Sequence, residues 1–271
     1  MMKIKFNLGL LFFALPLITS AQIRIKEIVY KRVNDRELNL KLFYPAEESH
    51  EQKAAILFFF GGGWISGSPV QFEEQAKHFA SLGMVGITAD YRTKSKDGTT
   101  PFEAVEDAKS ALTYIHEHAK DLGINRNKII ASGGSAGGHL AAATDLVVYG
   151  NSQAPRPNAL ILFNPVFNNG PGNYGYERVK EQYKVISPYH NIKRGAAPTL
   201  IVFGTKDHLV PVDTAKQYQQ VMLKYGNRCD LKLYENQKHG FFNYRTNGNN
   251  SFYHETLNEA DKFLKSLGYL K

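Results

Sequence analysis

Two kinds of apolar pattern alternate along the chain after residue 50. Short apolar runs, typical of strands buried on both faces, occur at 54–60, 84–89, 129–132, 159–163 and 199–203, and 231–234 is predicted as a further strand. Apolar residues at helical spacing occur at 70–82, 102–122, 136–148, 214–224 and 251–267. Before residue 50, the stretches 22–33 and 37–44 predict an opening pair of strands. This order predicts an α/β fold: a doubly wound, mostly parallel sheet of about eight strands, with helices on both faces.

Length and composition fit one large domain with a sizeable core. The chain has 271 residues, of which 43% are hydrophobic and 12% aromatic, which excludes a disordered chain. We find no linker and no internal repeat, so residues 22–271 are expected to form a single domain. The longest irregular stretch, 164–197, follows a late strand. It is expected to be either a small lid over the sheet edge or a disordered surface loop.

The first 21 residues have a different pattern. Lys3 and Lys5 precede an apolar run over 8–17, and the small residues 19–21 follow. This arrangement predicts a secretory signal peptide over 1–21, cleaved after Ala21. The apolar run has about half the length needed to cross a bilayer. Secretion or a periplasmic location is therefore favoured over a membrane anchor, and no stable membrane insertion is expected.

Charge and cysteine content narrow the function further. The net charge of +8 comes from scattered basic residues without interleaved aromatics, which argues against a nucleic-acid partner. The single cysteine, Cys229, excludes an intramolecular disulfide, so stability must come from the core. Oligomeric state does not follow from the sequence.

The segment Gly133-Gly134-Ser135-Ala136-Gly137 lies between a predicted strand and a predicted helix. The spacing alone is common, and the alternative interpretation is a glycine-rich turn without chemistry. A G-x-S-x-G at a strand-to-helix turn is, however, typical of the nucleophile elbow of α/β-hydrolases. The turn is so sharp that only small residues fit beside the serine. Ser135 is therefore the candidate nucleophile, at the carboxyl edge of the sheet.

A serine hydroxyl needs a base to activate it, and the base needs an orienting carboxylate. In α/β-hydrolases these follow in the order serine, acid, histidine. Asp207 lies on the loop that leaves the predicted strand 199–203, at the edge where open α/β sheets place their sites. Asp213 is the competitor, but its place near a helix start is explained by capping. Asp207 is therefore the candidate acid.

His239 lies just beyond the predicted strand 231–234 and is followed by Gly240, which allows a tight turn. The imidazole can then point back toward the sheet edge, so His239 is the candidate base. The other histidines after the serine are less well placed: they are His139, His190, His208 and His254.

The loop after the third predicted strand reads Phe60-Gly61-Gly62-Gly63-Trp64. Glycines without a Cβ let backbone amides approach a ligand closely. We expect the N–H groups of Gly62 and Gly63, with that of Ala136, to form an oxyanion hole. A P-loop is excluded because no Gly-Lys-Ser/Thr follows, and a dinucleotide fingerprint because Ser66 stands at its third glycine position.

These motifs together resemble a known family. They are Gly61-Gly62-Gly63-Trp64, Asp90-Tyr91-Arg92, Asp107, Gly133 to Gly138, Ser187-Pro188, Asp207 and His239-Gly240-Phe241. The chain resembles serine esterases of the α/β-hydrolase superfamily, near the hormone-sensitive-lipase-like and the bacterial acetyl- or feruloyl-esterase-like branches. The resemblance implies an acyl-enzyme mechanism without a cofactor or metal, and Asp90 and Asp107 are interpreted as structural.

One position departs from the family pattern. The family usually has a histidine before the three glycines, and here that residue is Phe60. The departure puts the hydrogen bonding of the glycine loop in doubt, but not the triad. Phe60 and Trp64 are candidate substrate-binding residues, with Phe60 as an apolar pocket wall.

Three functions were weighed on this basis. The first is a secreted esterase that acts on short acyl groups, including acetyl or feruloyl substituents of polysaccharides. Its substrate would be a small-molecule or polysaccharide ester. The second is a peptidase or amidase with the same triad, and the third is a non-catalytic binding module on a hydrolase scaffold. The presence of all three triad residues favours an enzyme, and the lack of an additional large domain favours an esterase.

Overall fold

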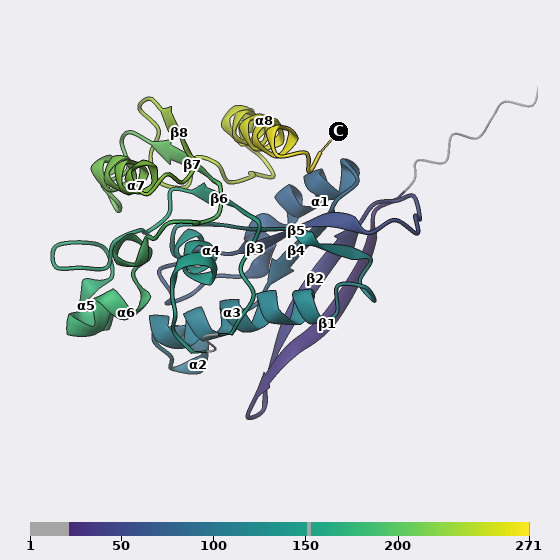
Figure 1. Ribbon diagram of the computed structural model, residues 1–271, viewed down its shortest axis with the longest axis horizontal. Helices are drawn as coiled ribbons and strands as arrows, with labels where there is room; N and C mark the ends of the chain where they lie inside the picture. Colours follow the sequence, from purple (N-terminus) through teal and green to yellow (C-terminus); the bar gives the residue numbers. More distant parts are fainter. Residues whose placement is uncertain (1–21, 151–152, 271) are drawn as a thin grey trace, which may run out of the picture.

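A computed structural model describes residues 22–150 and 153–270. The predicted signal peptide, residues 1–21, lies outside these described residues. One eight-stranded sheet forms the centre of the molecule (Figure 1). Its strands are β1 (Arg24–Val33), β2 (Arg36–Tyr44), β3 (Lys53–Phe59), β4 (Val85–Ala89), β5 (Ile124–Gly134), β6 (Ala159–Phe163), β7 (Thr199–Gly204) and β8 (Cys229–Tyr234).

The strand order across the sheet is β1-β2-β4-β3-β5-β6-β7-β8. β1 pairs antiparallel with β2, and β2 antiparallel with β4, whereas every later pair is parallel. The central strands are fully buried runs such as Ala159–Phe163, as the apolar patterns predict. Because β3, β5, β6, β7 and β8 run in the same direction, the loops that leave their carboxyl ends meet at one edge of the sheet.

Helices cover both faces of the sheet, as predicted. The longer helices are α1 (Glu73–Ser81), α3 (Pro101–Glu117), α4 (Ala136–Leu146), α7 (Val212–Lys224) and α8 (Ser251–Ser266). Residues of α3, α4 and α7 share one core with one face of the sheet, and residues of α1 and α8 share a second core with the other (Figure 1). Both cores are apolar, so they account for the stability of a fold without disulfides.

Helix α3 shows how local sequence sets an element's bounds. Thr100 accepts a hydrogen bond from Phe102 N, and Glu103 accepts one from Thr100 N, which together form a capping box. Pro101 occupies the first turn, where its missing N–H costs nothing. The helix ends at Glu117, earlier than the predicted 122, and β5 begins at Ile124, earlier than the predicted 129, because β5 also pairs with Lys53 at the start of β3.

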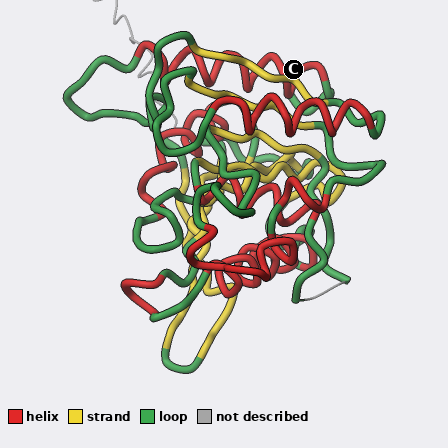
Figure 2. The backbone as a smooth tube through the Cα atoms, turned by 90° about the vertical axis from the view of Figure 1, so that its left-hand side faces the viewer, coloured by secondary structure: helices red, strands yellow, loops and turns green. Residues whose placement is uncertain are grey.

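The β1–β2 hairpin projects well beyond the helices that cover the sheet (Figure 2). The irregular stretch 164–197 contains short helices: α5 (Tyr176–Val179), α6 (Tyr183–Ile186) and 3₁₀ turns at Lys180–Gln182 and Pro188–Asn191. Val166, Phe167 and Ile186 are buried in the core beneath it. The stretch is therefore a packed part of the domain, and the alternative of a disordered surface loop was wrong.

Two short elements have not yet been named. Of these, α2 (Lys94–Asp97) was not predicted from the sequence, and a 3₁₀ turn at Pro69–Phe72 leads into α1. None of the helices in residues 22–150 and 153–270 combines the length and the apolar character needed to cross a membrane.

Candidate active site

Ser135 stands at the turn between β5 and α4, with φ 55° and ψ −121°. This positive φ is rare for a residue with a side chain and marks stored backbone strain. Neighbouring strands hold the turn in place. Ser135 N donates to Phe163 O at 3.0 Å, and Val166 N donates to Ser135 O at 3.2 Å. The strained turn lies at the carboxyl edge, as a nucleophile elbow requires.

The glycines around Ser135 are required by close backbone approach. A Cβ at Gly133 would lie 2.5 Å from Phe59 O, and one at Gly137 would lie 2.0 Å from the same oxygen. Neither distance can be relieved by rotating a side chain, because the obstacle is backbone. The expected need for small residues at this turn is thus confirmed.

Asp207 and His239 lie on the loops after β7 and β8 and are hydrogen-bonded to each other. His239 Nδ1 is 2.6 Å from Asp207 Oδ2. The other carboxylate oxygen, Oδ1, accepts from the backbone N–H groups of Leu209 at 2.9 Å and Val210 at 3.0 Å. The Asp207 side chain is fully buried, whereas that of His239 is 20% exposed. The carboxylate is therefore fixed inside the protein while the imidazole can reach solvent.

The environment of Asp207 favours its charged form. Burial by itself raises the pKa of the carboxyl, but hydrogen bonds from His239, Val210 N and Asn164 outweigh burial and lower that pKa below its ordinary value. The carboxylate can then hold the proton on Nδ1 of His239. Nε2 is left as the nitrogen that accepts a proton from a nucleophile.

Packing brings the His239 loop to the serine turn. A Cβ at Gly134 would lie 2.6 Å from Cζ of Phe242, three residues beyond the histidine. Another at Gly204, the last residue of β7, would lie 2.4 Å from Gln237 O. The loop after β8 therefore crosses the ends of β7 and β5. All three predicted triad residues lie at the same edge of the sheet.

The glycine loop lies against the other side of the serine turn. A Cβ at Gly61 would be 3.3 Å from Cβ of Ser135. Gly62 and Gly63 have φ of 120° and 64°, which favour glycine. Their carbonyls accept hydrogen bonds, from Ile65 N for Gly62 and from Arg178 Nη1 for Gly63.

The amides of this loop are available to a ligand. Within residues 22–150 and 153–270, no hydrogen bond uses the N–H of Gly62 or Gly63. Ala136, directly after Ser135, is the first residue of α4, and N–H groups in a first helical turn have no intrahelical acceptor. The N–H groups of Gly62 and Gly63 are thus unengaged within the described chain, in a loop that touches the serine turn at Gly61, and their role as oxyanion donors stays a prediction.

Tyr91 and Gln71 form the hydrogen bonds that hold the glycine loop, although Phe60 replaces the histidine that the family usually has there. The Tyr91 hydroxyl donates to Phe60 O at 2.8 Å, and the two rings stack with centroids 4.0 Å apart. Gly61 N donates to Gln71 Oε1 at 2.6 Å. These contacts hold the loop without the family's usual histidine. In the sequence, Tyr91 stands within a family motif that gives it no role of its own, and no motif marks Gln71.

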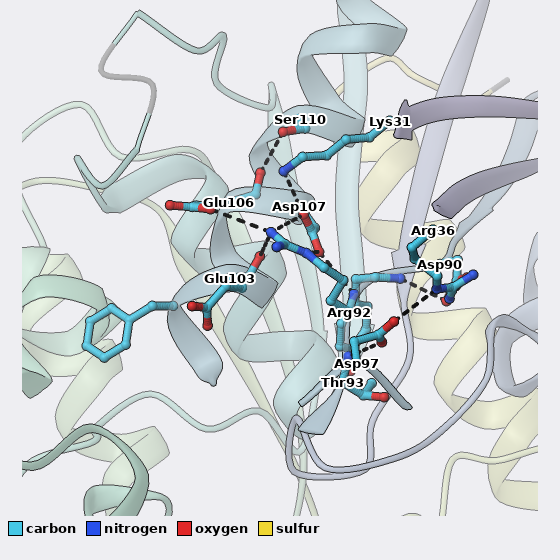
Figure 3. Close-up of polar contacts among 12 residues, drawn as sticks. Lys31, Arg36, Asp90, Arg92, Thr93, Asp97, Glu103, Glu106, Asp107 and Ser110 are labelled. Carbon is cyan, nitrogen blue, oxygen red and sulfur yellow. Dashed lines mark hydrogen bonds and ion pairs between the residues drawn. The ribbon is translucent and has the colours of Figure 1, made fainter. Parts of the chain in front are cut away.

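The residues that flank Tyr91 in the sequence, Asp90 and Arg92, belong to a network of charged side chains (Figure 3). The guanidinium of Arg92 bonds both carboxylate oxygens of the fully buried Asp107, each at 2.8 Å, and Lys31 Nζ lies 2.7 Å from Asp107 Oδ1. Arg36 bonds Asp90. These contacts support the interpretation of Asp90 and Asp107 as structural residues, and they join the β1–β2 hairpin to the segment that contains Tyr91.

Phe60 and Trp64 are each only 1% exposed. Trp64 packs edge-on against His139, with ring centroids 5.0 Å apart, and burial lowers the pKa of His139 to about 4, so that ring is neutral. Trp64 also lines a cavity of about 430 Å³ together with Lys94 and Arg178. Contact of Phe60 or Trp64 with a substrate stays a prediction.

The competing acid and the adjacent histidine do not join the site. Asp213 lies in the first turn of α7 and is paired with Lys216 at 3.0 Å. His208 is exposed. The hydrogen bond from His239 goes to Asp207, so the choice made from the sequence matches the geometry.

The sheet and the residues at its carboxyl edge define a class of protein, the carboxylic ester hydrolases of the α/β-hydrolase fold. Comparison with known proteins supports this class. The BD-FAE family model matches residues 40–155. Esterase 2 of Thermogutta terrifontis, in a structure phosphorylated by paraoxon, is 43% identical, with a TM-score of 0.84 over 92% of this chain and 95% of that one. The chain belongs to the α/β-hydrolase serine esterases.

Two further comparisons concern ligands and length. A butyrate-bound structure of the Thermogutta terrifontis esterase is 40% identical, with a TM-score of 0.84 over 94% of this chain and 97% of that one. The acetylxylan esterase of Xylanibacter ruminicola is 30% identical over 87% of this chain. This chain spans half the length of that acetylxylan esterase.

Proposed function

We propose that this chain is a secreted serine esterase that hydrolyses carboxylic esters of short acyl groups through an acyl-enzyme at Ser135. One observation carries the proposal: the bonded pair Asp207–His239 lies at the sheet edge where Ser135 occupies a strained turn. A strained, buried, charge-stabilised arrangement of this kind costs stability and is typical of catalytic sites.

The geometry supports the following steps. His239 Nε2 takes the proton from Ser135 Oγ as Oγ forms a bond to the ester carbonyl carbon. The N–H groups of Gly62, Gly63 and Ala136 stabilise the negative charge that develops on the carbonyl oxygen. His239 gives the proton to the departing alcohol, and Asp207 stabilises the charged imidazole in between. Water, activated by the same histidine, then releases the acid and restores the serine.

The substrate part of the proposal rests on the relatives and on the compact chain. One relative is named an acetylxylan esterase, and another is seen with bound butyrate. We therefore infer acetyl or feruloyl substituents of polysaccharides as the esters cleaved. Export through residues 1–21 would bring the enzyme to such polymers. A panel of p-nitrophenyl esters of increasing acyl length, with acetylated and feruloylated xylans, tests this part.

The nucleophile is tested by Ser135→Ala assayed on p-nitrophenyl acetate. We expect kcat to fall by about 10⁴ or more, the usual size of a triad loss. Paraoxon should phosphorylate the wild type and leave Ser135→Ala unmodified, as seen by intact mass. Ser132→Ala is the matched control. Ser132 lies in the same strand and donates to Ile161 O, and its loss should leave kcat close to wild type. An active Ser135→Ala enzyme would refute the mechanism.

A further inference from the structure

Asn164 is a buried residue that the mechanism above does not use. It directly follows Phe163, the last residue of β6, and precedes Pro165. Its side chain is completely buried and its φ is 42°, a value that few residues with a side chain adopt. Its amide oxygen Oδ1 is buried and has no hydrogen-bond partner within the described chain. Burial without a partner and a positive φ are each unfavourable.

The compensating contact is with the catalytic carboxylate. Asn164 Nδ2 lies 2.5 Å from Asp207 Oδ2, the same oxygen that is 2.6 Å from His239 Nδ1. The amide nitrogen must face this oxygen, because the amide oxygen in its place would repel the carboxylate. The other carboxylate oxygen, Oδ1 of Asp207, accepts hydrogen bonds from two backbone N–H groups. Both oxygens of Asp207 therefore have donors, and the carboxylate cannot rotate freely.

We propose that Asn164 is a positioning residue of the catalytic machinery, whose amide fixes the Asp207 carboxylate toward His239. The inference rests on the proposed function, since it gives Asn164 a purpose only if the Asp207–His239 pair acts on Ser135. The lowered pKa of Asp207, to which the Asn164 hydrogen bond contributes after those of His239 and Val210, supports the same role.

Asn164 also has a backbone contact that any residue would make. Its N–H donates to Val202 O at 2.8 Å, which ties the end of β6 to β7. A purely architectural role would therefore survive removal of the side chain. Glycine tolerates a positive φ without strain, so Asn164→Gly removes the amide and keeps the backbone.

The matched control is Asn158→Gly, at the opposite end of the same strand. Asn158 Oδ1 accepts from Ile129 N at 2.8 Å, so this variant also loses one side-chain hydrogen bond at a terminus of β6. It lies at the amino edge of the sheet, away from Ser135. If the melting temperatures of the two variants fall by similar amounts, a difference in their activity does not come from a difference in stability.

On p-nitrophenyl acetate we expect Asn164→Gly to lower kcat by about tenfold or more, the effect of one hydrogen bond to a charged group. KM should stay within about twofold of wild type, because the amide does not touch the substrate. The acid limb of the kcat profile should move to higher pH, since the carboxylate loses a donor that stabilises its ionised form. Asn158→Gly should show neither change.

Asn164→Asp is a second variant in case the glycine variant does not fold. Two carboxylates this close cannot both ionise readily, so its acid limb should also move to higher pH. Wild-type kcat and an unmoved acid limb in a folded Asn164 variant would overturn the inference. If Ser135→Ala is inactive in the same assay, the proposed function would still stand. An active Ser135→Ala would overturn both.

Discussion

The two sides of the serine turn differ in the groups that they present: side chains on one side and backbone amides on the other. On one side, Asp207 and His239 are side chains oriented by hydrogen bonds to a carboxylate. On the other, the glycine loop offers backbone amides, and its shape depends on positive φ angles and on contacts to its carbonyls. The first side is sensitive to charge and protonation. The second is sensitive to volume and backbone shape, so substitutions should affect the two sides in different ways.

Of the substitutions that distinguish the two sides of the serine turn, Gly62→Ala is expected to have the largest effect on kcat. A Cβ at Gly62 would lie 1.9 Å from Ser66 O, so the loop must move and its oxyanion donors are displaced. We expect kcat on p-nitrophenyl acetate to fall about 10²- to 10³-fold, with an unchanged pH profile. Gly172→Ala is the control, because Gly172 also has a positive φ but has open space around it. Equal activity of the two variants would contradict this view of the loop.

Tyr91→Phe sharpens the comparison at the support of the loop. It removes the hydroxyl that donates to Phe60 O and keeps the stacked ring. Leaving a buried carbonyl without its donor costs about 1–3 kcal/mol, and we expect kcat to fall roughly fivefold to tenfold as the loop loosens. Tyr30→Phe is matched to it, since the Tyr30 hydroxyl donates to Asp90 O and not to the loop. If both variants lose equal activity, Tyr91 has no special role in holding the loop.

The smallest expected effect concerns the side of Asp207 and His239, and it is an effect on the melting temperature. The native pKa of Asp207 is lowered, so its contribution to stability is fully present above about pH 4, the ordinary aspartate range. It is lost as pH falls through the native value. The melting temperature of wild type should therefore exceed that of Asp207→Asn by a few degrees near neutral pH. This difference in melting temperature should shrink on acidification. A difference that stays constant from pH 7 to pH 2 would refute the prediction.

Much of the site could be predicted because its signals are local. A glycine pattern between a strand and a helix marks Ser135, and loops after apolar strands mark Asp207 and His239. The roles of Asn164 and Tyr91 depend instead on which strands are neighbours. Asn164 reaches Asp207 because β6 lies beside β7, and Tyr91 reaches Phe60 because β4 lies beside β3. An Asn-Pro after a strand reads only as an ordinary turn.

The fold was predicted for the same reason, and the failure to recognise the stretch 164–197 as packed structure has a physical cause. Strand and helix periodicities are local, so the elements and the α/β class follow from them. The stretch 164–197 has no sustained period, yet Val166, Phe167 and Ile186 are buried at intervals along it. Single apolar anchors of this kind cannot be distinguished from scattered surface residues until the surrounding core is known.

The strand order also gives the catalytic groups unequal local stability. Ser135 follows β5, a central strand whose last residues are fully buried, whereas His239 follows β8, an edge strand in which only Cys229 is buried. Edge strands generally open before central ones, which amide hydrogen exchange detects. A fluctuation that detaches β8 would displace His239, the proposed base, and leave the turn at Ser135 intact. Heating should therefore inactivate the enzyme reversibly below the temperature at which the whole domain melts.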